Sequence, residues 1–161
     1  MALIPTYTPM RTDENSVSLD QVFLGGINIY LQQKFGFFRH TPRFLDRFFD
    51  HPSLLKAASA AGSKTDAQEL GELTLATLDG EHGPLKKEFE RLTNWLKDTY
   101  KPDIVQLTNS MFAGMAAPLK RALNVPVLCA MQGEDIFLDQ LPEAHKNAAF
   151  DRLRLKAKDI D

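Results

Sequence analysis

The order of elements expected near the carboxyl end of the chain constrains its fold more than any other feature. KPDIVQLTN (residues 101–109) reads as a turn, a strand and a polar end, and VPVLCAM (residues 125–131) reads as a second strand. Between them, NSMFAGMAAPLKRALN has the apolar spacing of a helix. A strand, a helix and a strand within about thirty residues predict a βαβ unit. Such a unit requires parallel strands and a right-handed crossover.

Details of this unit can also be predicted. The second strand is expected to be buried on both faces, because Val127, Leu128 and their neighbours are uninterrupted apolar residues. The helix between the strands is expected to be capped by Asn109 or Ser110. Pro118 should kink or divide that helix, because proline lacks a backbone donor and clashes with the preceding turn.

From residue 41 to about residue 100 the pattern is mainly helical. Thr65 and Asp66 are candidate caps for one helix in this stretch. The clearest helix is GPLKKEFERLTNWLKDTY, whose apolar stripe at spacing i, i+4, i+7, i+11 consists of Leu85, Phe89, Leu92 and Leu96. A last helix is expected in PEAHKNAAFDRLRLKAKD. The sequence therefore predicts an α/β fold with a helical insertion at about 41–100.

Composition limits the classes of protein that fit. The chain has 161 residues, 43% hydrophobic and 25% charged, which suits a single domain with its own core. The net charge of -2 provides no global basic field, so nucleic acid is not an expected partner. One cysteine excludes an intramolecular disulfide framework and fits a reducing compartment. No apolar run is long enough for a membrane span and MALIPTYTPM is not a signal peptide, so a cytoplasmic location is expected.

Polar residues follow both predicted strands. The first strand ends in Thr108-Asn109-Ser110 and the second in Gln132-Gly133-Glu134-Asp135. Parallel strands place these ends at one edge of the sheet, where open α/β sheets bind ligands. Glu134 and Asp135 are candidates for a general base or for acceptors of a hydroxyl group. The alternative is structural, because turns and helix caps need these residue types whatever the function, and Asp135 suits a cap for the IFL stretch that follows.

Gly25 and Gly26 form a second candidate site. They belong at the same edge if residues 2–5 form the first strand of the sheet. A glycine pair at the start of a helix exposes backbone N–H groups that suit a phosphate or a sugar oxygen. The chain contains neither GxGxxG nor GxxxxGK[ST], so the usual dinucleotide and P-loop fingerprints are absent from the sequence.

A metal site is not expected. The four histidines, at positions 40, 51, 82 and 145, have neither i, i+4 nor HxH spacing. Asp159-Ile160-Asp161 spells DxD, a metal-binding triplet of some glycosyltransferases, but it closes a charged helix and no strand precedes it. Cys129 lies within an apolar strand and is interpreted as a core residue rather than a nucleophile.

The order of three segments resembles a known enzyme family. GGINIYLQQ after a polar loop, then PDIVQLTN and a helix, then VPVLCAMQGEDIFLD is similar to the N-terminal half of retaining family 4 glycosyltransferases of the GT-B type. The likeness is closest to a bacterial branch with a helical insertion such as ELGELTLATLDGEHG, and it covers most of the chain. It implies one Rossmann-like domain over residues 1–161, with a parallel sheet flanked by helices.

The resemblance also implies an activity and roles for particular residues. The family transfers a sugar from a nucleotide-sugar donor to an acceptor with retention of configuration, and it needs no catalytic metal or other cofactor. Its N-terminal domain binds mainly the acceptor, and a C-terminal domain binds the donor. Gly25 and Gly26 match the loop near the donor diphosphate. Asn109 and the loop Gly133-Glu134-Asp135 match positions near the transferred sugar and the acceptor.

Three features depart from the family pattern. The first strand is short, and Gln132-Gly133 stands where many relatives carry a histidine. The chain also stops at Asp161, where relatives continue into a further strand and the donor-binding domain. An isolated N-terminal domain is therefore expected to be inactive alone, and its exposed apolar surfaces are expected to favour a dimer.

A non-catalytic binding module, flavodoxin-like or receiver-like, is the alternative from a different class. A receiver requires acidic residues after its first strand and an aspartate at the end of a central strand. The corresponding positions here hold Pro5-Thr6 and Thr108-Asn109, which disfavours a receiver.

Overall fold

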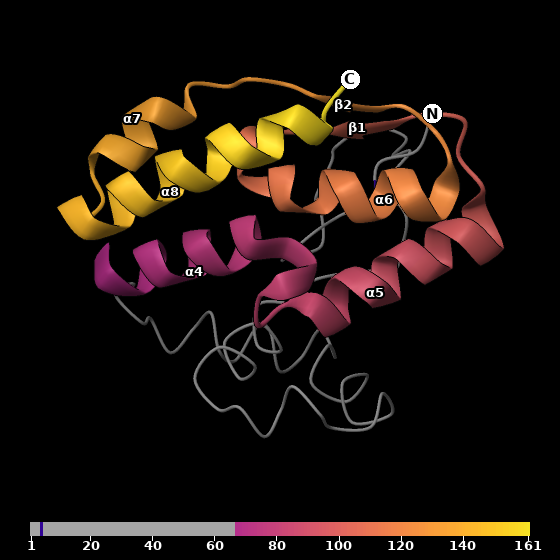
Figure 1. Ribbon diagram of the computed structural model, residues 1–161, viewed down its shortest axis with the longest axis horizontal. Coiled ribbons are helices and arrows are strands. Elements are labelled where there is room, and N and C mark those ends of the chain that lie inside the picture. Colours follow the sequence, from indigo (N-terminus) through magenta and orange to yellow (C-terminus); the bar gives the residue numbers. More distant parts are fainter. Residues whose placement is uncertain (1–3, 5–66) are drawn as a thin grey trace, which may run out of the picture. The chain divides into compact units, whose positions relative to one another are not determined.

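The computed structural model describes Ile4 and residues 67–161 (Figure 1). All described helices and strands belong to one compact unit, residues 65–161. The predictions for Gly25 and Gly26, for the helices between residues 41 and 66 and for the caps Thr65 and Asp66 lie outside the described residues. The assignment of residues 1–161 to a single domain stays a prediction.

The described region is mostly helical and contains a small parallel sheet, which agrees with an α/β class. Its helices are α4 (Ala67–Asp79), α5 (Lys86–Trp95), α6 (Ala116–Leu123), α7 (Glu134–Asp139) and α8 (Glu143–Lys156). Its strands are β1 (Val105–Leu107) and β2 (Val127–Cys129). Shorter helical turns are η2 (Gly80–His82), η3 (Leu96–Tyr100), η4 (Ser110–Met115) and η5 (Ala157–Asp159). The helical character predicted for the part of the insertion at 67–100 is confirmed.

The two strands pair in parallel, as the βαβ pattern predicted. Val105 pairs with Val127, and the register continues to Leu107 opposite Cys129. The connection consists of η4 and α6, and α6 contacts β2. The sequence between the strands therefore supplies both the crossover and part of the cover of the sheet.

The prediction that β2 is buried on both faces is wrong for one face. Val127 is fully buried, but the next residue, Leu128, is 37% exposed, and Gln106 opposite it is also exposed. Successive side chains of a strand point to opposite faces. Helix α6 covers the face that carries Val127, and no helix of the described region buries the face that carries Leu128 and Gln106. An apolar run alone did not distinguish these two faces.

The amphipathic pattern of α5 is confirmed. The predicted stripe is buried at all four positions, namely Leu85, Phe89, Leu92 and Leu96. One acidic residue, Glu88, is buried in the same helix and forms an ion pair with Arg91 at 3.4 Å. Helical structure ends at Lys101, whose φ of 51° is left-handed, directly before Pro102.

The helical crossover is divided, as expected for a segment that contains Pro118. Asn109 is the N-cap of η4, and its Oδ1 accepts a hydrogen bond from the Met111 N–H at 3.1 Å. The 3-10 helix η4 changes to α-helix at Ala116, so Pro118 lies in the first turn of α6. A missing N–H costs little there, because the first N–H groups of a helix have no intrahelical partner.

Helix α4 packs against both α8 and η4, and in Figure 1 α8 runs alongside α4. At the junction of α4 and η4, the end of α4 and Gly80, the first residue of η2, approach η4 backbone to backbone. Gly80 has a left-handed φ of 60°, and a Cβ at this position would collide with the carbonyl oxygen of Gly114. A Cβ at Gly114 would in turn lie 2.5 Å from the Leu78 carbonyl oxygen. Only glycine fits at either position.

Around this contact lies a compact apolar cluster. Its buried members are Leu78, Ala113, Leu138, Leu141 and Ala149, which come from α4, η4, α7, the loop after α7 and α8. Helix α8 is also tied to the end of α4 by charge, since the Arg152 Nε donates to the Asp79 Oδ1 at 2.6 Å. The cluster thus joins the helical insertion to the elements that follow each strand.

The chain end differs from the predicted helix at Asp159-Ile160-Asp161. Only Asp159 is helical, in η5, whereas Ile160 is extended. The Asp161 N–H donates to the Val127 carbonyl oxygen at 3.0 Å, and the Asp161 Oδ2 accepts from the Val127 N–H at 2.9 Å. The Lys120 Nζ holds the other oxygen of Asp161 at 2.7 Å. Asp161 therefore extends beside β2 rather than closing a helix.

Candidate functional site at the strand ends

The loops that follow β1 and β2 are joined by one carboxylate. The Glu134 Oε1 accepts a hydrogen bond from the Ser110 N–H at 2.7 Å. The Glu134 Oε2 accepts from the Gln132 N–H, also at 2.7 Å. Ser110 starts the crossover helix and Gln132 follows β2, so Glu134 fixes the spacing of the two loops. The shared edge predicted from parallel pairing is therefore present.

Gly133 provides the backbone geometry that aims Glu134 at this edge. It is the N-cap of α7, with a left-handed φ of 77°. An added Cβ would meet no atom closer than 3.9 Å, so glycine is favoured there by conformation and not by crowding. The alternative prediction, that Asp135 caps the IFL helix, is wrong, because α7 already begins at Glu134. Asp135 lies in the first turn with an exposed side chain.

The electrostatics of Glu134 follow from its hydrogen bonds. Burial alone would raise the pKa of Glu134, but the backbone N–H groups of Ser110 and Gln132 outweigh it and lower the pKa below the ordinary value. Glu134 is therefore an anion at neutral pH with both oxygens engaged. This geometry suits a residue that positions the loops, and it leaves Asp135 as the exposed carboxylate of the pair.

Cys129, at the end of β2, has the opposite tendency. Burial raises the pKa of its thiol, and the negative charge of Glu134 raises it further. The thiol stays protonated at neutral pH and is a weak nucleophile. This environment agrees with the interpretation that Cys129 is not a nucleophile, but its side chain is only partly buried and does not belong to the core.

Four of the six predicted site residues lie in these two loops or in the first turn of α7. Asn109, Gly133, Glu134 and Asp135 are together at the carboxyl ends of the strands, whereas Gly25 and Gly26 lie outside the described residues. The sequence reasoning missed the role of the Ser110 and Gln132 backbone N–H groups. The only signal in the sequence was weak. It is a carboxylate soon after the second strand, which can reach the start of the helix that follows the first strand.

Two classes of site can be assessed within the described region. Residues 67–161 hold no group of three or more histidine, cysteine, aspartate or glutamate side chains placed to bind a metal ion. None of the helices in this same range combines the length and apolar character needed to cross a bilayer.

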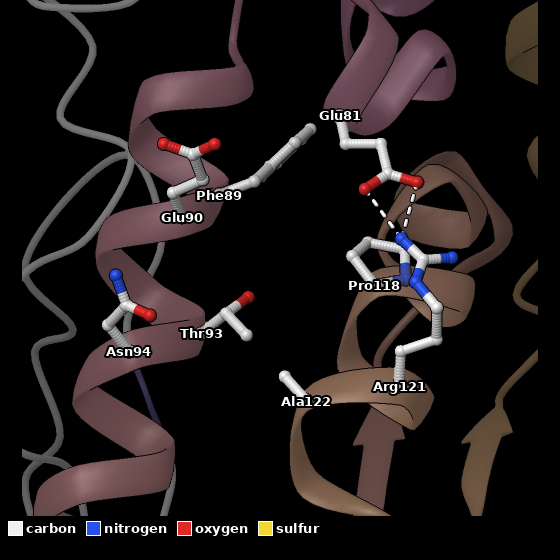
Figure 2. Close-up of a pocket in the computed structure, with 8 residues that line it drawn as sticks. All are labelled: Glu81, Phe89, Glu90, Thr93, Asn94, Pro118, Arg121 and Ala122. Atoms are coloured by element: carbon white, nitrogen blue, oxygen red, sulfur yellow. Dashed lines mark hydrogen bonds and ion pairs between the residues drawn. The ribbon is translucent and has the colours of Figure 1, made fainter.

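A separate pocket lies between α5 and α6 (Figure 2). Its volume is about 250 Å³. Phe89 and Thr93 point from α5 toward α6, where Pro118 and Ala122 face them. The Arg121 side chain contributes one end of the pocket. It shares no residue with the strand-end loops.

Comparisons of the chain with known proteins found no relative. No model of a protein family, no curated protein and no solved structure matches the chain. The resemblance to family 4 glycosyltransferases therefore stays a prediction that depends on the segments GGINIYLQQ, PDIVQLTN and VPVLCAMQGEDIFLD.

Proposed function

We propose that the chain is the acceptor-side domain of a cytoplasmic glycosyltransferase that transfers a sugar from a nucleotide-sugar donor with retention of configuration. The observation that supports this most directly is the link between the two strand ends, made by Glu134 to the Ser110 N–H. Ligands of open parallel sheets bind at such ends. A Rossmann-like sheet, extended beyond β1 and β2, is part of the proposal.

Within this proposal the two carboxylates have different roles. Asp135, with its exposed side chain, accepts the hydroxyl group of the acceptor. Glu134 keeps Asn109 and Gly133 at the spacing that the sugar requires, because it bridges their loops. No metal takes part in this scheme.

In this proposal the donor is bound mainly by a second domain. In the complete enzyme the departing nucleotide phosphate takes up the proton of the acceptor, and backbone N–H groups of Gly25 and Gly26 stabilise its charge. Residues 1–161 in isolation are therefore expected to be inactive, and their partners are the donor domain, the nucleotide-sugar and the acceptor.

Calorimetric titration tests the proposal. We expect UDP- and GDP-sugars to bind only to a protein that also contains a donor-binding domain, and Asp135→Asn to weaken acceptor binding to that protein. Asp139→Asn is the control, because Asp139 is also an exposed carboxylate of α7, at the other end of the helix, where it pairs with Lys146 at 3.3 Å. Tight binding of a nucleotide-sugar by residues 1–161 alone would show that the donor site lies in this domain, and it would contradict the proposal.

A non-catalytic flavodoxin-like or receiver-like binding module is the second candidate. It is favoured by one observation, namely that both oxygens of Glu134 are used by backbone N–H groups. Such a carboxylate stabilises loops without chemistry. A downstream reading frame that encodes a donor domain with an E-x7-E pattern favours the enzyme, and a stop codon or an output domain favours the module.

Self-association remains part of the proposal. Its support is a set of exposed large apolar side chains in the described region: Ile104, Leu128, Met131, Ile136 and Leu155. Light scattering over a range of concentrations is the appropriate measurement. A monomer at the highest concentration would remove this part of the proposal.

A further inference from the structure

The pocket between α5 and α6 combines an apolar floor with polar groups at its rim. Phe89, Pro118 and Ala122 form the floor, and Thr93 adds a hydroxyl group from α5. At one end of the rim, Arg121 Nη2 donates to both carboxylate oxygens of Glu81 at 2.6 Å (Figure 2). This combination of apolar surface and a few polar groups is typical of small-molecule sites.

The charges at this rim are balanced, which limits the class of ligand. Glu81 is neutralised by Arg121. Glu90 lies on the opposite side and faces Lys86 one helical turn away, at 3.8 Å. A strongly anionic ligand would meet two carboxylates, and a cation would compete with basic side chains that are already in place. An uncharged polar ligand meets neither obstacle.

The lining of the pocket offers both hydrogen-bond donors and acceptors. The Arg121 guanidinium has five N–H donors, and only its Nη2 is bonded to Glu81. Asn94, beside Thr93 on α5, offers both a donor and an acceptor. Thr93 and Glu90 add further acceptor oxygens. A ligand with several hydroxyl groups can use both kinds of partner.

We propose that the α5–α6 pocket binds an uncharged, hydroxylated ring of the size of a monosaccharide. The volume of about 250 Å³ is below the range of drug-sized sites, which suits a single ring. One face of the ring packs on Pro118 and Ala122, and its hydroxyl groups contact Arg121 and Thr93. The pocket shares no residue with the strand ends, so this proposal is independent of the proposed function.

Two-dimensional ¹H–¹⁵N NMR of the full chain tests the proposal. Glucose, galactose and N-acetylglucosamine are the probes. Because the pocket is open and small, we expect fast exchange and saturable shifts with a dissociation constant of about 1–10 mM. The shifts should be concentrated at the amides of Thr93, Asn94 and Ala122.

A variant that fills the pocket with a larger side chain tests most directly whether the sugar binds there. Ala122→Leu should abolish the saturable shifts, because the larger side chain occupies the floor. Ala144→Leu is the matched control, since Ala144 is an exposed residue of α8 outside the pocket, and it should leave the shifts unchanged. The same spectra report whether each variant is folded. Thr93→Val, which keeps the side-chain volume and removes the hydroxyl group, should weaken binding by about 3-fold or more.

Three results would overturn the proposal. The first is the absence of saturable shifts up to about 100 mM sugar, an order of magnitude above the expected dissociation constant. The second is shifts confined to the strand-end loops, which would support the proposed function and show that the sugar does not bind in the α5–α6 pocket. The third is stronger binding of adenosine or of an alkylammonium ion than of any sugar. Asp135→Asn should not alter the shifts at the pocket, so a failure here is distinguishable from a failure of the proposed function.

Discussion

Two regions of the molecule bring distant parts of the chain together by opposite means. At the junction of α4 and η4, Gly80 and Gly114 allow backbone to approach backbone because neither has a side chain. At the strand ends, the Glu134 side chain spans the gap between two loops with hydrogen bonds of 2.7 Å. The first contact depends on the absence of atoms and the second on the presence of a charge.

This difference has consequences for sensitivity. A close-packed junction cannot accept even a methyl group, because protein interiors have few voids and transmit strain. A charged hydrogen bond at an exposed edge can be replaced by water or by a related side chain at modest cost. We therefore expect the junction to be sensitive to added volume and insensitive to pH, and the strand ends to show the reverse.

The largest effect is expected for Gly80→Ala. The new Cβ would collide with the Gly114 carbonyl oxygen, and alanine would also be forced into a left-handed φ of 60°. Overpacking and backbone strain together should lower the free energy of unfolding by about 3 kcal/mol or more. Urea unfolding monitored by circular dichroism measures this loss.

Gly133→Ala separates the two causes. Gly133 has a φ of 77°, but the space around it is open. Alanine there should cost only the backbone strain, about 1–2 kcal/mol. Equal losses for the two variants would mean that the junction of α4 and η4 is not as tight as its geometry indicates.

An intermediate effect is expected for Gly71→Ala, where the obstacle is a side chain. A Cβ at Gly71, on α4, would lie 2.5 Å from the Cγ of His145 on α8. The imidazole can rotate away, but the His145 Cβ would lie 2.9 Å from the new Cβ and can move only with the backbone of α8. We therefore expect a loss of about 1–3 kcal/mol in thermal unfolding. In a double-mutant cycle, His145→Ala should recover part of this loss. A strictly additive double variant would show that the two residues do not compete for the same space.

The elements of the described region were largely predictable from the sequence, because their patterns are local. The stripe that begins at Leu85 and Phe89 identified α5, and the polar ends of two apolar runs identified the parallel strands. Asn109, one of the two predicted candidates, is also the cap. Each of these signals depends on residues within a few positions of one another.

Contacts over long separations in the sequence were not predictable in the same way. Nothing in the sequence near Gly80 indicates that Gly114 will lie against it. A glycine allows a close contact because it has no side chain, but it does not specify which residue makes that contact. The exposure of Leu128 depends on which face the helices cover, and apolar character alone does not specify that. For the candidate site, the sequence predicted the edge where Glu134 lies but not its bond to the Ser110 N–H.

The strand ends should be the pH-sensitive region. Because hydrogen bonds lower the folded-state pKa of Glu134, its contribution to stability is present above the unfolded value near 4.5 and is lost as pH falls through the folded value. Glu134→Gln should reduce the free energy of unfolding at pH 7 by about 1 kcal/mol. It should also flatten the acid side of the stability curve below pH 4.5.

Unfolding curves collected at a series of pH values test this expectation. Gly80→Ala, if enough of it folds, is the appropriate comparison, because it should lower stability equally at every pH. If the free energy of unfolding falls equally with acid in Glu134→Gln and in the original chain, the bridge does not depend on ionisation of Glu134. The contrast between the two regions would then fail.

The smallest effects are expected for ion pairs between helices. Arg152 binds Asp79 across α8 and α4 with about a third of each side chain exposed, so Arg152→Ala should cost about 1 kcal/mol. Arg121 is paired with Glu81 at a similar distance but is 60% exposed, and Arg121→Ala should cost about 0.5 kcal/mol or less. Both losses should shrink in high salt, where exposed charges are screened. A loss for Arg152→Ala that persists in high salt would instead indicate that its aliphatic stem packs on α4, which would assign this contact to the close-packed junction rather than to the charged contacts.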